Sequence, residues 1–125
     1  MEALGKKKWV IPGGHIPLKS TGKEPEMVSQ DKIAILNTGL NTVKLRLTVF
    51  YSGDDPVNNY ILNVKGRRLK KIRINDLIDP FPVTLETDYS LLIEAEEPVV
   101  VQFLRMDTGY RNVAVMGAMG FGTDF

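Results

Sequence analysis

The feature that most constrains the fold of this chain is an alternation of residue character from Val43 to Tyr51, with Phe50 as its one exception. Every odd-numbered position in this segment is apolar or aromatic, whereas Lys44, Arg46 and Thr48 occupy even-numbered positions. Side chains of an extended strand alternate between two faces, while those of a helix repeat about every 3.6 residues. The segment therefore predicts a β-strand with one face buried and the other in solvent.

Further segments of this character are separated by turn-forming residues. The predicted strands cover residues 8–11, 32–36, 43–51, 60–64, 69–74, 89–95 and 99–106. We expect a hairpin at residues 65–68 and a turn at Glu96-Glu97-Pro98, where Gly and Pro interrupt the pattern. No segment has the periodicity of an amphipathic helix. The chain is therefore predicted to be all-β, a single-domain β-sandwich of jelly-roll-like architecture spanning residues 1–125.

Two regions fit this pattern less well. Residues 13–26 contain two prolines and several charges, so we expect a long surface loop. The tail, residues 112–125, combines apolar residues with Gly117, Gly120 and Gly122. It is compatible with a last strand, a subunit contact or a flexible end. The glycine spacing is not that of a nucleotide-binding loop, because no strand–helix context surrounds it.

Composition narrows the class of protein. The chain has no cysteine, which excludes disulfide frameworks, thiolate nucleophiles and cysteine-based zinc sites. A net charge of +1 argues against a protein that coats nucleic acid as a whole, although it allows a local basic patch. No apolar run reaches the roughly 20 residues of a membrane span, and no leader peptide is visible. We expect a cytoplasmic protein.

Charge is strongly segregated along the second half of the chain. Six basic residues fall within nine positions: Lys65, Arg67, Arg68, Lys70, Lys71 and Arg73. The following stretch, residues 74–104, has seven acidic residues and no Lys or Arg. On an extended strand Arg67, Lys71 and Arg73 would share one side. Such a stripe fits an edge strand protected from aggregation by its charges, or a surface that tracks the phosphates of an anionic partner such as DNA.

Polar residues at strand ends are the candidate ligand contacts. Arg105 and Asp107 end an apolar segment, and Gln102 lies within it as a predicted buried polar group. Trp9 and His15 flank the first loop. An aromatic ring beside hydrogen-bonding groups suits a sugar-like small molecule. The competing interpretation is structural: Trp9 belongs to the core and Arg105 pairs with Asp107.

The sequence does not predict an enzyme. His15 is the single histidine, so it can build neither a His-rich metal site nor a catalytic triad supported by neighbouring residues. Asp76 and Asp79-Pro80 read as turn formers, and the oxygen-ligand spacing of an EF-hand is absent. We therefore expect no catalytic residue, no metal and no cofactor.

A colinear set of short motifs resembles one known family. It includes Trp9, Arg67-Arg68, Asn75-Asp76-Leu77, Asp79-Pro80 and the pattern Gln102-x-x-Arg105-x-Asp107. Their order and spacing are similar to the Anabaena sensory rhodopsin transducer family over residues 9–107.

This resemblance implies a β-sandwich subunit, assembled into a homotetramer in the cytoplasm. It also implies a signalling role at the cytoplasmic side of a membrane sensory rhodopsin, and an association with DNA. The fold of the family is similar to carbohydrate-binding sandwiches. The alternatives to a non-enzymatic transducer are therefore a binding module for a carbohydrate-like small molecule and a DNA-associated regulator that uses the basic hairpin.

Overall fold

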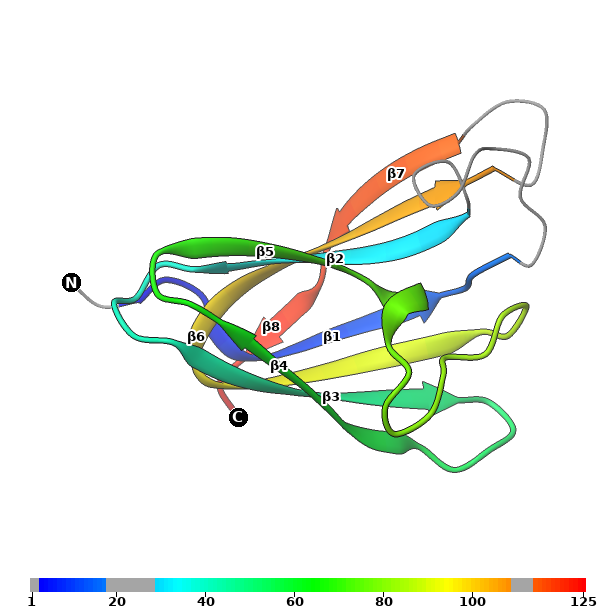
Figure 1. The fold of residues 1–125 in the computed structure, drawn as a ribbon, viewed down its shortest axis with the longest axis horizontal. Coiled ribbons are helices and arrows are strands. Elements are labelled where there is room, and N and C mark those ends of the chain that lie inside the picture. Colours follow the sequence, from blue (N-terminus) through cyan, green and yellow to red (C-terminus); the bar gives the residue numbers. More distant parts are fainter. Residues whose placement is uncertain (1–2, 18–28, 109–113) are drawn as a thin grey trace.

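Eight antiparallel strands and one short 3₁₀ turn account for almost all regular structure in a computed structural model that describes residues 3–17, 29–108 and 114–125 (Figure 1). The elements are β1 (Lys6–Gly14), β2 (Gln30–Asn37), β3 (Val43–Tyr51), β4 (Val57–Val64), β5 (Arg68–Arg73), η1 (Ile74–Asp76), β6 (Tyr89–Asp107), β7 (Ala114–Met119) and β8 (Phe121–Thr123). The all-β prediction is confirmed, and β3 has the predicted bounds. Among the described residues there is no helix long and apolar enough to cross a membrane.

The strands form two layers that share β6. One layer has the order β4-β3-β6-β1-β8, and the other has the order β5-β2-β6-β7. Figure 1 shows β6 curving from the first layer into the second. The β4–β5 connection and the β7–β8 connection each join an edge of one layer to an edge of the other. The result is the predicted β-sandwich.

The predicted turn at Glu96-Glu97-Pro98 is wrong, because β6 continues through these residues. Pairing with β3 ends at Ala95 and pairing with β2 begins at Val100. The residues between them therefore form the bend by which β6 changes layers. Proline lacks a backbone N–H and is tolerated where a strand bends or its ladder is interrupted. Pro98 therefore marks a bend within one strand and not a reversal of the chain.

The predicted hairpin between residues 60–64 and 69–74 is also wrong. The strand β4 pairs with β3, whereas β5 pairs with β2 in the other layer. The corner between them packs on the preceding turn: the Arg67 N–H donates to the Gly39 carbonyl at 2.9 Å. A Cβ on Gly66 would lie 2.1 Å from the Leu40 carbonyl oxygen, so only glycine fits there.

The core lies between the two layers. Leu45, Leu47 and Val49 of β3 face it with no exposed surface, as the alternation predicts. Ile33 and Ile35 of β2 meet them from the other layer, also fully buried.

The second half of β6 is covered on only one face. Val99, Val101 and Phe103 are buried. The alternate residues are half-buried or exposed, and Gln102 is exposed. The prediction that Gln102 is a buried polar group is therefore wrong: with Val101 and Phe103 facing inward, the period of two directs Gln102 outward.

The described part of the tail forms two strands, over residues 114–119 and 121–123, which agrees with the last-strand alternative, while a subunit contact stays a prediction. The turn predicted around Asn75 and Asp76 is also confirmed, as the 3₁₀ turn η1. Most of the predicted loop 13–26 and the first residues of the tail, 112–113, lie outside the described residues.

Candidate functional site

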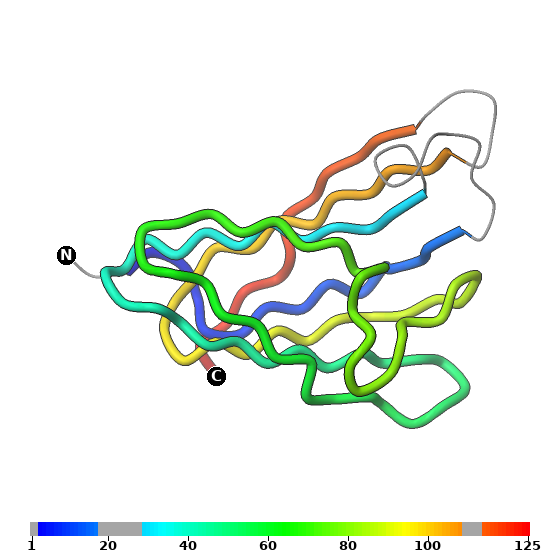
Figure 2. Tube along the Cα trace, viewed as in Figure 1, coloured from blue at the N-terminus to red at the C-terminus, as the bar shows by residue number. Residues whose placement is uncertain are grey.

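Four segments meet at one end of the sandwich. These are the end of β1, the start of β2, and both ends of β6, all at the right-hand end of Figure 2. Asp31 of β2 lies at their centre and is fully buried. A buried carboxylate is costly unless it is paired and hydrogen-bonded, so its partners define the site.

Asp31 accepts hydrogen bonds from all the other segments. Its Oδ1 accepts from Arg105 Nε at 2.9 Å, and its Oδ2 accepts from the Tyr89 hydroxyl at 2.6 Å. The same Oδ2 accepts the backbone N–H of His15 at 3.0 Å. Arg105 also donates through Nη2 to the Gly13 carbonyl at 3.0 Å. The negative charge is thus matched by a cation and two neutral donors.

Burial and pairing shift the acid–base behaviour of two of these groups. Burial, followed by the nearby charge of Asp31, raises the pKa of Tyr89 far above its usual value, so the phenol stays a donor. The hydrogen bond to Asp31 raises the pKa of Arg105, against the smaller effect of burial. Both shifts keep the Tyr89 phenol and the Arg105 guanidinium protonated at neutral pH.

Gly14 explains how Tyr89 reaches Asp31. These two residues are cross-strand partners of β1 and β6. A Cβ on Gly14 would lie 2.3 Å from the Tyr89 ring, so the ring occupies the space that a side chain would fill. The glycine is therefore needed for this close approach.

His15 lies at the exposed rim of this network, between two acidic side chains. Its Nδ1 is 2.9 Å from Asp88 Oδ1, and its Nε2 is 3.5 Å from Glu86 Oε2. The Glu86 N–H donates to the Ile16 carbonyl at 2.8 Å, which ties the loop before β6 to the end of β1. Nowhere in the described part of the chain do three His, Asp or Glu side chains group as metal ligands would.

The structure brings together only some of the predicted ligand contacts. His15 and Arg105 lie in the Asp31 network, and Asp107 is nearby, where it accepts from the Ser29 hydroxyl at 3.5 Å. The carboxylate that Arg105 holds at 2.9 Å is Asp31, where the sequence had suggested Asp107.

Trp9 lies apart from this group, in the core. Its Nε1 donates to the Lys6 and Val99 carbonyls. Its ring is covered by β8, where a Cβ on Gly122 would lie 3.1 Å from it. Trp9 therefore offers no open aromatic face to a ligand here, and a sugar-like ligand stays a prediction.

Sequence reasoning missed Asp31 and Tyr89. The sequence did contain a signal for Asp31. It lies two residues before Ile33 and four before Ile35, so its side chain falls on the same, buried face of the strand. Nothing local pointed to its partners. Tyr89 and Arg105 are 58 and 74 residues away along the chain.

The basic residues lie on an edge of the second layer. Within the described residues β5 pairs with β2 alone. Arg68, Lys70 and Lys71 are exposed, and Arg73 is paired with Asp76 at 3.5 Å. Arg67 is in the turn before β5, with a φ of 57°, so the predicted three-charge stripe reduces to Lys71 and Arg73 on the strand.

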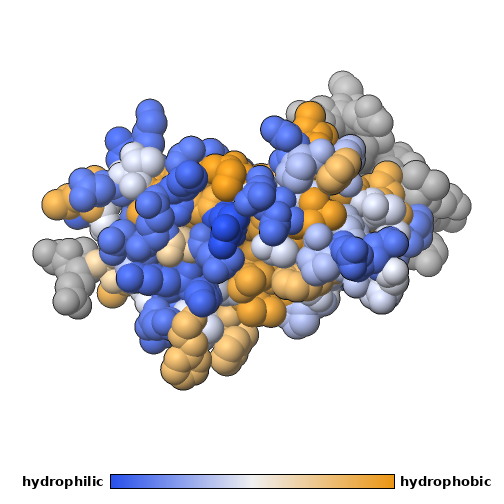
Figure 3. Space-filling model, turned by 90° about the horizontal axis from the view of Figure 1, so that it is seen from below, coloured by the Kyte–Doolittle hydropathy of each residue, from blue (hydrophilic) through white to orange (hydrophobic). Residues whose placement is uncertain are grey.

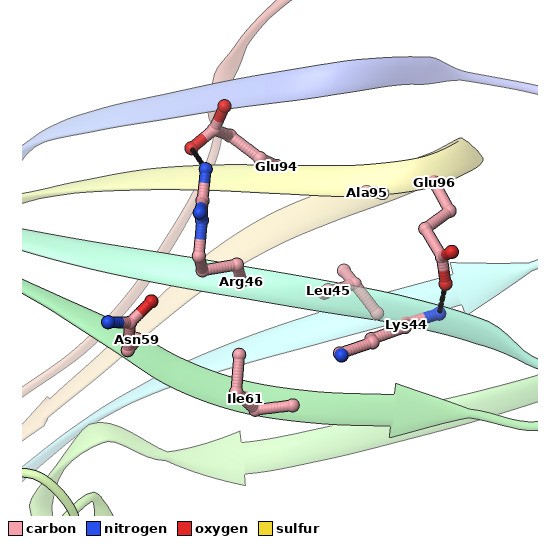
Figure 4. Close-up of a pocket in the computed structure, with 8 residues that line it drawn as sticks. All are labelled: Lys44, Leu45, Arg46, Asn59, Ile61, Glu94, Ala95 and Glu96. Carbon is pink, nitrogen blue, oxygen red and sulfur yellow. Dashed lines mark hydrogen bonds and ion pairs between the residues drawn. The ribbon is translucent and has the colours of Figure 1, made fainter.

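A second polar surface, which the sequence did not single out, lies on the outer face of β3, β4 and β6 (Figure 4). It is an open hollow of about 410 Å³. Arg46 Nη2 donates to Glu94 Oε1 at 3.1 Å, and the Lys44 N–H donates to Glu96 Oε1 at 3.1 Å. Asn59 and Ile61 form its other side. Two basic and two acidic side chains line it, and Arg46 and Glu94 form an ion pair across it.

The fold and the site define an all-β sandwich whose polar centre is a closed ionic network between strand ends. The sequence matches the family described as Anabaena sensory rhodopsin transducer over residues 4–122. The chain belongs to this family.

Two solved structures support this assignment. The structure titled "Anabaena sensory rhodopsin transducer" is 37% identical, with a TM-score of 0.75, and the match covers 82% of this chain and 97% of that chain. The "Crystal Structure of Thermotoga maritima 1070" is 28% identical, with a TM-score of 0.84, and covers 96% of this chain and 97% of that one. A search among curated proteins found no match.

Proposed function

We propose that this chain is a non-enzymatic signalling protein, a cytoplasmic transducer that binds a membrane sensory rhodopsin and works as a homotetramer. The observation that carries the proposal is the 37% identity to a sensory rhodopsin transducer over 97% of that chain. The family match over residues 4–122 supports it across nearly the whole sequence.

The chemistry of the site supports a binding role over catalysis. A general base needs a lone pair that can reach a substrate proton. Both oxygens of Asp31 already accept protein donors, and the residue is fully buried. The raised pKa of Tyr89 keeps its proton in place at neutral pH. The network is suited to fixing the ends of strands that present a binding surface.

Binding to a sensory rhodopsin in lipid nanodiscs tests the proposal. The purified protein should bind these nanodiscs more strongly than empty nanodiscs of the same lipid. Illumination should change its affinity by about fivefold or more, which is the lower end of typical coupling between two sites. Equal binding to loaded and empty nanodiscs would overturn the proposal.

DNA association is the second candidate function, and the open edge at β5 favours it. The basic cluster there comprises Lys65, Arg67, Arg68, Lys70, Lys71 and Arg73. Affinity for duplex DNA should fall with salt, with a log–log slope of about −0.9 per neutralised phosphate. The triple variant Arg67→Ala, Lys71→Ala, Arg73→Ala should flatten this slope. If DNA binds this variant with the wild-type slope, or fails to bind wild type at low salt, the cluster serves as edge protection.

A further inference from the structure

A pocket of about 210 Å³ lies at the end of the first layer, next to the Asp31 network. Pro12 of β1 and Phe50 of β3 form apolar parts of its lining, and Asp88 and Ser90 line it around the start of β6. Pockets that hold a whole small-molecule ligand usually have about 300–1,000 Å³. The size of this pocket therefore suits one side chain of a partner protein better than a complete small molecule.

The lining combines an aromatic ring with an available carboxylate oxygen. Phe50 is 41% exposed, and Ser90 is its cross-strand partner. The Ser90 hydroxyl is already engaged, because it donates to the Pro12 carbonyl at 2.6 Å. The Asp88 side chain is 88% exposed, and His15 Nδ1 is 2.9 Å from its Oδ1. Among the described residues no group donates to Asp88 Oδ2, so this oxygen can accept from a ligand.

The surroundings of the pocket are acidic. Two loops, residues 52–56 and 77–88, contribute to its lining. These loops contain neither lysine nor arginine and carry five exposed acidic residues: Asp54, Asp55, Asp79, Glu86 and Asp88. Arg73 and Arg105, at the same end of the molecule, are each paired with another carboxylate. Seen from below, this right-hand end presents hydrophilic side chains beside apolar ones (Figure 3). The charge and the ring together favour a cation that has a flat or apolar surface.

We propose that this pocket binds an arginine side chain from a basic segment of a partner protein. A guanidinium group is planar, so it can stack on the Phe50 ring while its N–H groups donate to Asp88 Oδ2. Lysine fits less well, because its ammonium group is a compact and strongly hydrated charge. The choice of partner rests on the proposed function. Cytoplasmic loops of membrane proteins carry an excess of lysine and arginine, so the occupant is an arginine of a cytoplasmic loop of the sensory rhodopsin.

The chain holds one of its own arginines by the same combination of groups. The guanidinium carbon of Arg105 lies 5.5 Å from the centre of the Phe103 ring, and its Nε donates to Asp31 at 2.9 Å. A ring and a carboxylate thus bind a guanidinium within the site already described. At Phe50 and Asp88 a ring and a carboxylate line one pocket, and no arginine of the described chain lines it.

Nuclear magnetic resonance titration of the isotope-labelled protein tests the pocket without any rhodopsin. The probe is N-acetyl-arginine amide, and N-acetyl-citrulline amide is its uncharged counterpart of nearly the same shape. The arginine probe should shift the backbone amide signals of residues 50–52 and 88–90, and the lysine analogue should shift them less. The citrulline probe should leave them unchanged. Equal shifts with arginine and citrulline, or arginine shifts confined to other residues, would overturn the proposal.

Variants of the ring and the carboxylate locate the binding in this pocket. Phe50→Leu keeps the apolar bulk and removes the aromatic ring, and Asp88→Asn removes the charge. Each should weaken binding of the arginine probe about two- to fivefold and leave the circular dichroism spectrum unchanged. Phe121→Leu is the matched control for the ring, since Phe121 is an exposed phenylalanine on β8. Asp124→Asn is the control for the charge, since Asp124 is an exposed carboxylate paired with Lys6. Controls that weaken binding as much as the pocket variants would contradict the assignment of the pocket.

Nanodiscs that contain the sensory rhodopsin test the choice of partner. The double variant Phe50→Leu, Asp88→Asn should bind them at least about fourfold more weakly than wild type. The double control Phe121→Leu, Asp124→Asn should bind them as wild type does. Wild-type affinity in the double variant would overturn the rhodopsin loop as the occupant. If wild type itself does not bind the rhodopsin, the proposed function fails, whereas shifts specific to the arginine probe still establish the pocket.

Discussion

Replacing Arg105 with methionine should destabilise the fold strongly, because it leaves a buried charge without its cation. Asp31 is fully buried, and Arg105 Nε is 2.9 Å from its Oδ1. Removing one partner of a buried ion pair costs about 3–5 kcal/mol. The Arg105 side chain is 25% exposed, so water screens part of the interaction and places the expected loss near the lower limit, about 3 kcal/mol.

Urea unfolding at pH 7 measures this loss, with wild type, Arg105→Met, Asp31→Asn and the double variant compared by linear extrapolation. In the Asp31→Asn background no buried charge is left behind, so Arg105→Met should cost much less there. The difference is the coupling free energy between the two residues, which we expect at about 2–3 kcal/mol.

An exposed ion pair is the matched control for this cycle. Arg46 Nη2 is 3.1 Å from Glu94 Oε1, but the Arg46 side chain is 51% exposed. Arg46→Met should therefore cost no more than about 1 kcal/mol. If Arg105→Met costs as little as Arg46→Met, or if the double variant is additive, the Asp31 network does not hold the sandwich together.

Three further outcomes follow from the same structure. Tyr89→Phe should cost about 1.5–3 kcal/mol in urea unfolding, since it removes a hydrogen bond to a charged group. Because folding raises the pKa of Tyr89, the stabilisation that this residue gives the fold is fully present below about pH 10 and is lost as pH rises above that value. The free energy of unfolding of Tyr89→Phe should therefore fall less at alkaline pH than that of wild type. Gly122→Val should displace β8 and shift the fluorescence of Trp9, the single tryptophan, to longer wavelength. Light scattering of wild type at micromolar concentration should give about four times the 14.0 kDa chain mass, and a monomer mass would contradict the tetramer.

The parts of the fold that sequence predicted well are those set by local alternation. The strand from Val43 to Tyr51 was predicted to the residue, because one buried face forces a period of two on the sequence. The bend at Pro98 and the corner at Gly66 were not. Proline and glycine mark an interruption of the strand, but only pairing with distant strands decides whether the chain reverses, bends or changes layers.

The candidate site was harder to predict than the fold, for a related reason. Arg105 and His15 were selected because polar residues at strand ends often bind ligands, and both lie in the site. Their common partner was not selected. Asp31 precedes the predicted strand 32–36 and so resembles an ordinary surface carboxylate. Only its even spacing from the buried Ile33, two residues on, indicates that its side chain points to the buried face. The identity of its donors depends on contacts across the whole chain.

The position of these donors links the network to the architecture itself. Tyr89 is the first residue of β6, and Arg105 is near its end, yet both donate to one carboxylate. A straight strand would hold the two residues about 50 Å apart, at about 3.3 Å per residue. They can meet at Asp31 only because β6 bends from one layer into the other. The hydrogen bonds at Asp31 therefore form only when the sandwich is closed, and a partner that loosens this end of the molecule would have to act against them. The end at Asp31 is therefore the place where the stability of the fold depends most directly on the joining of the two layers by β6.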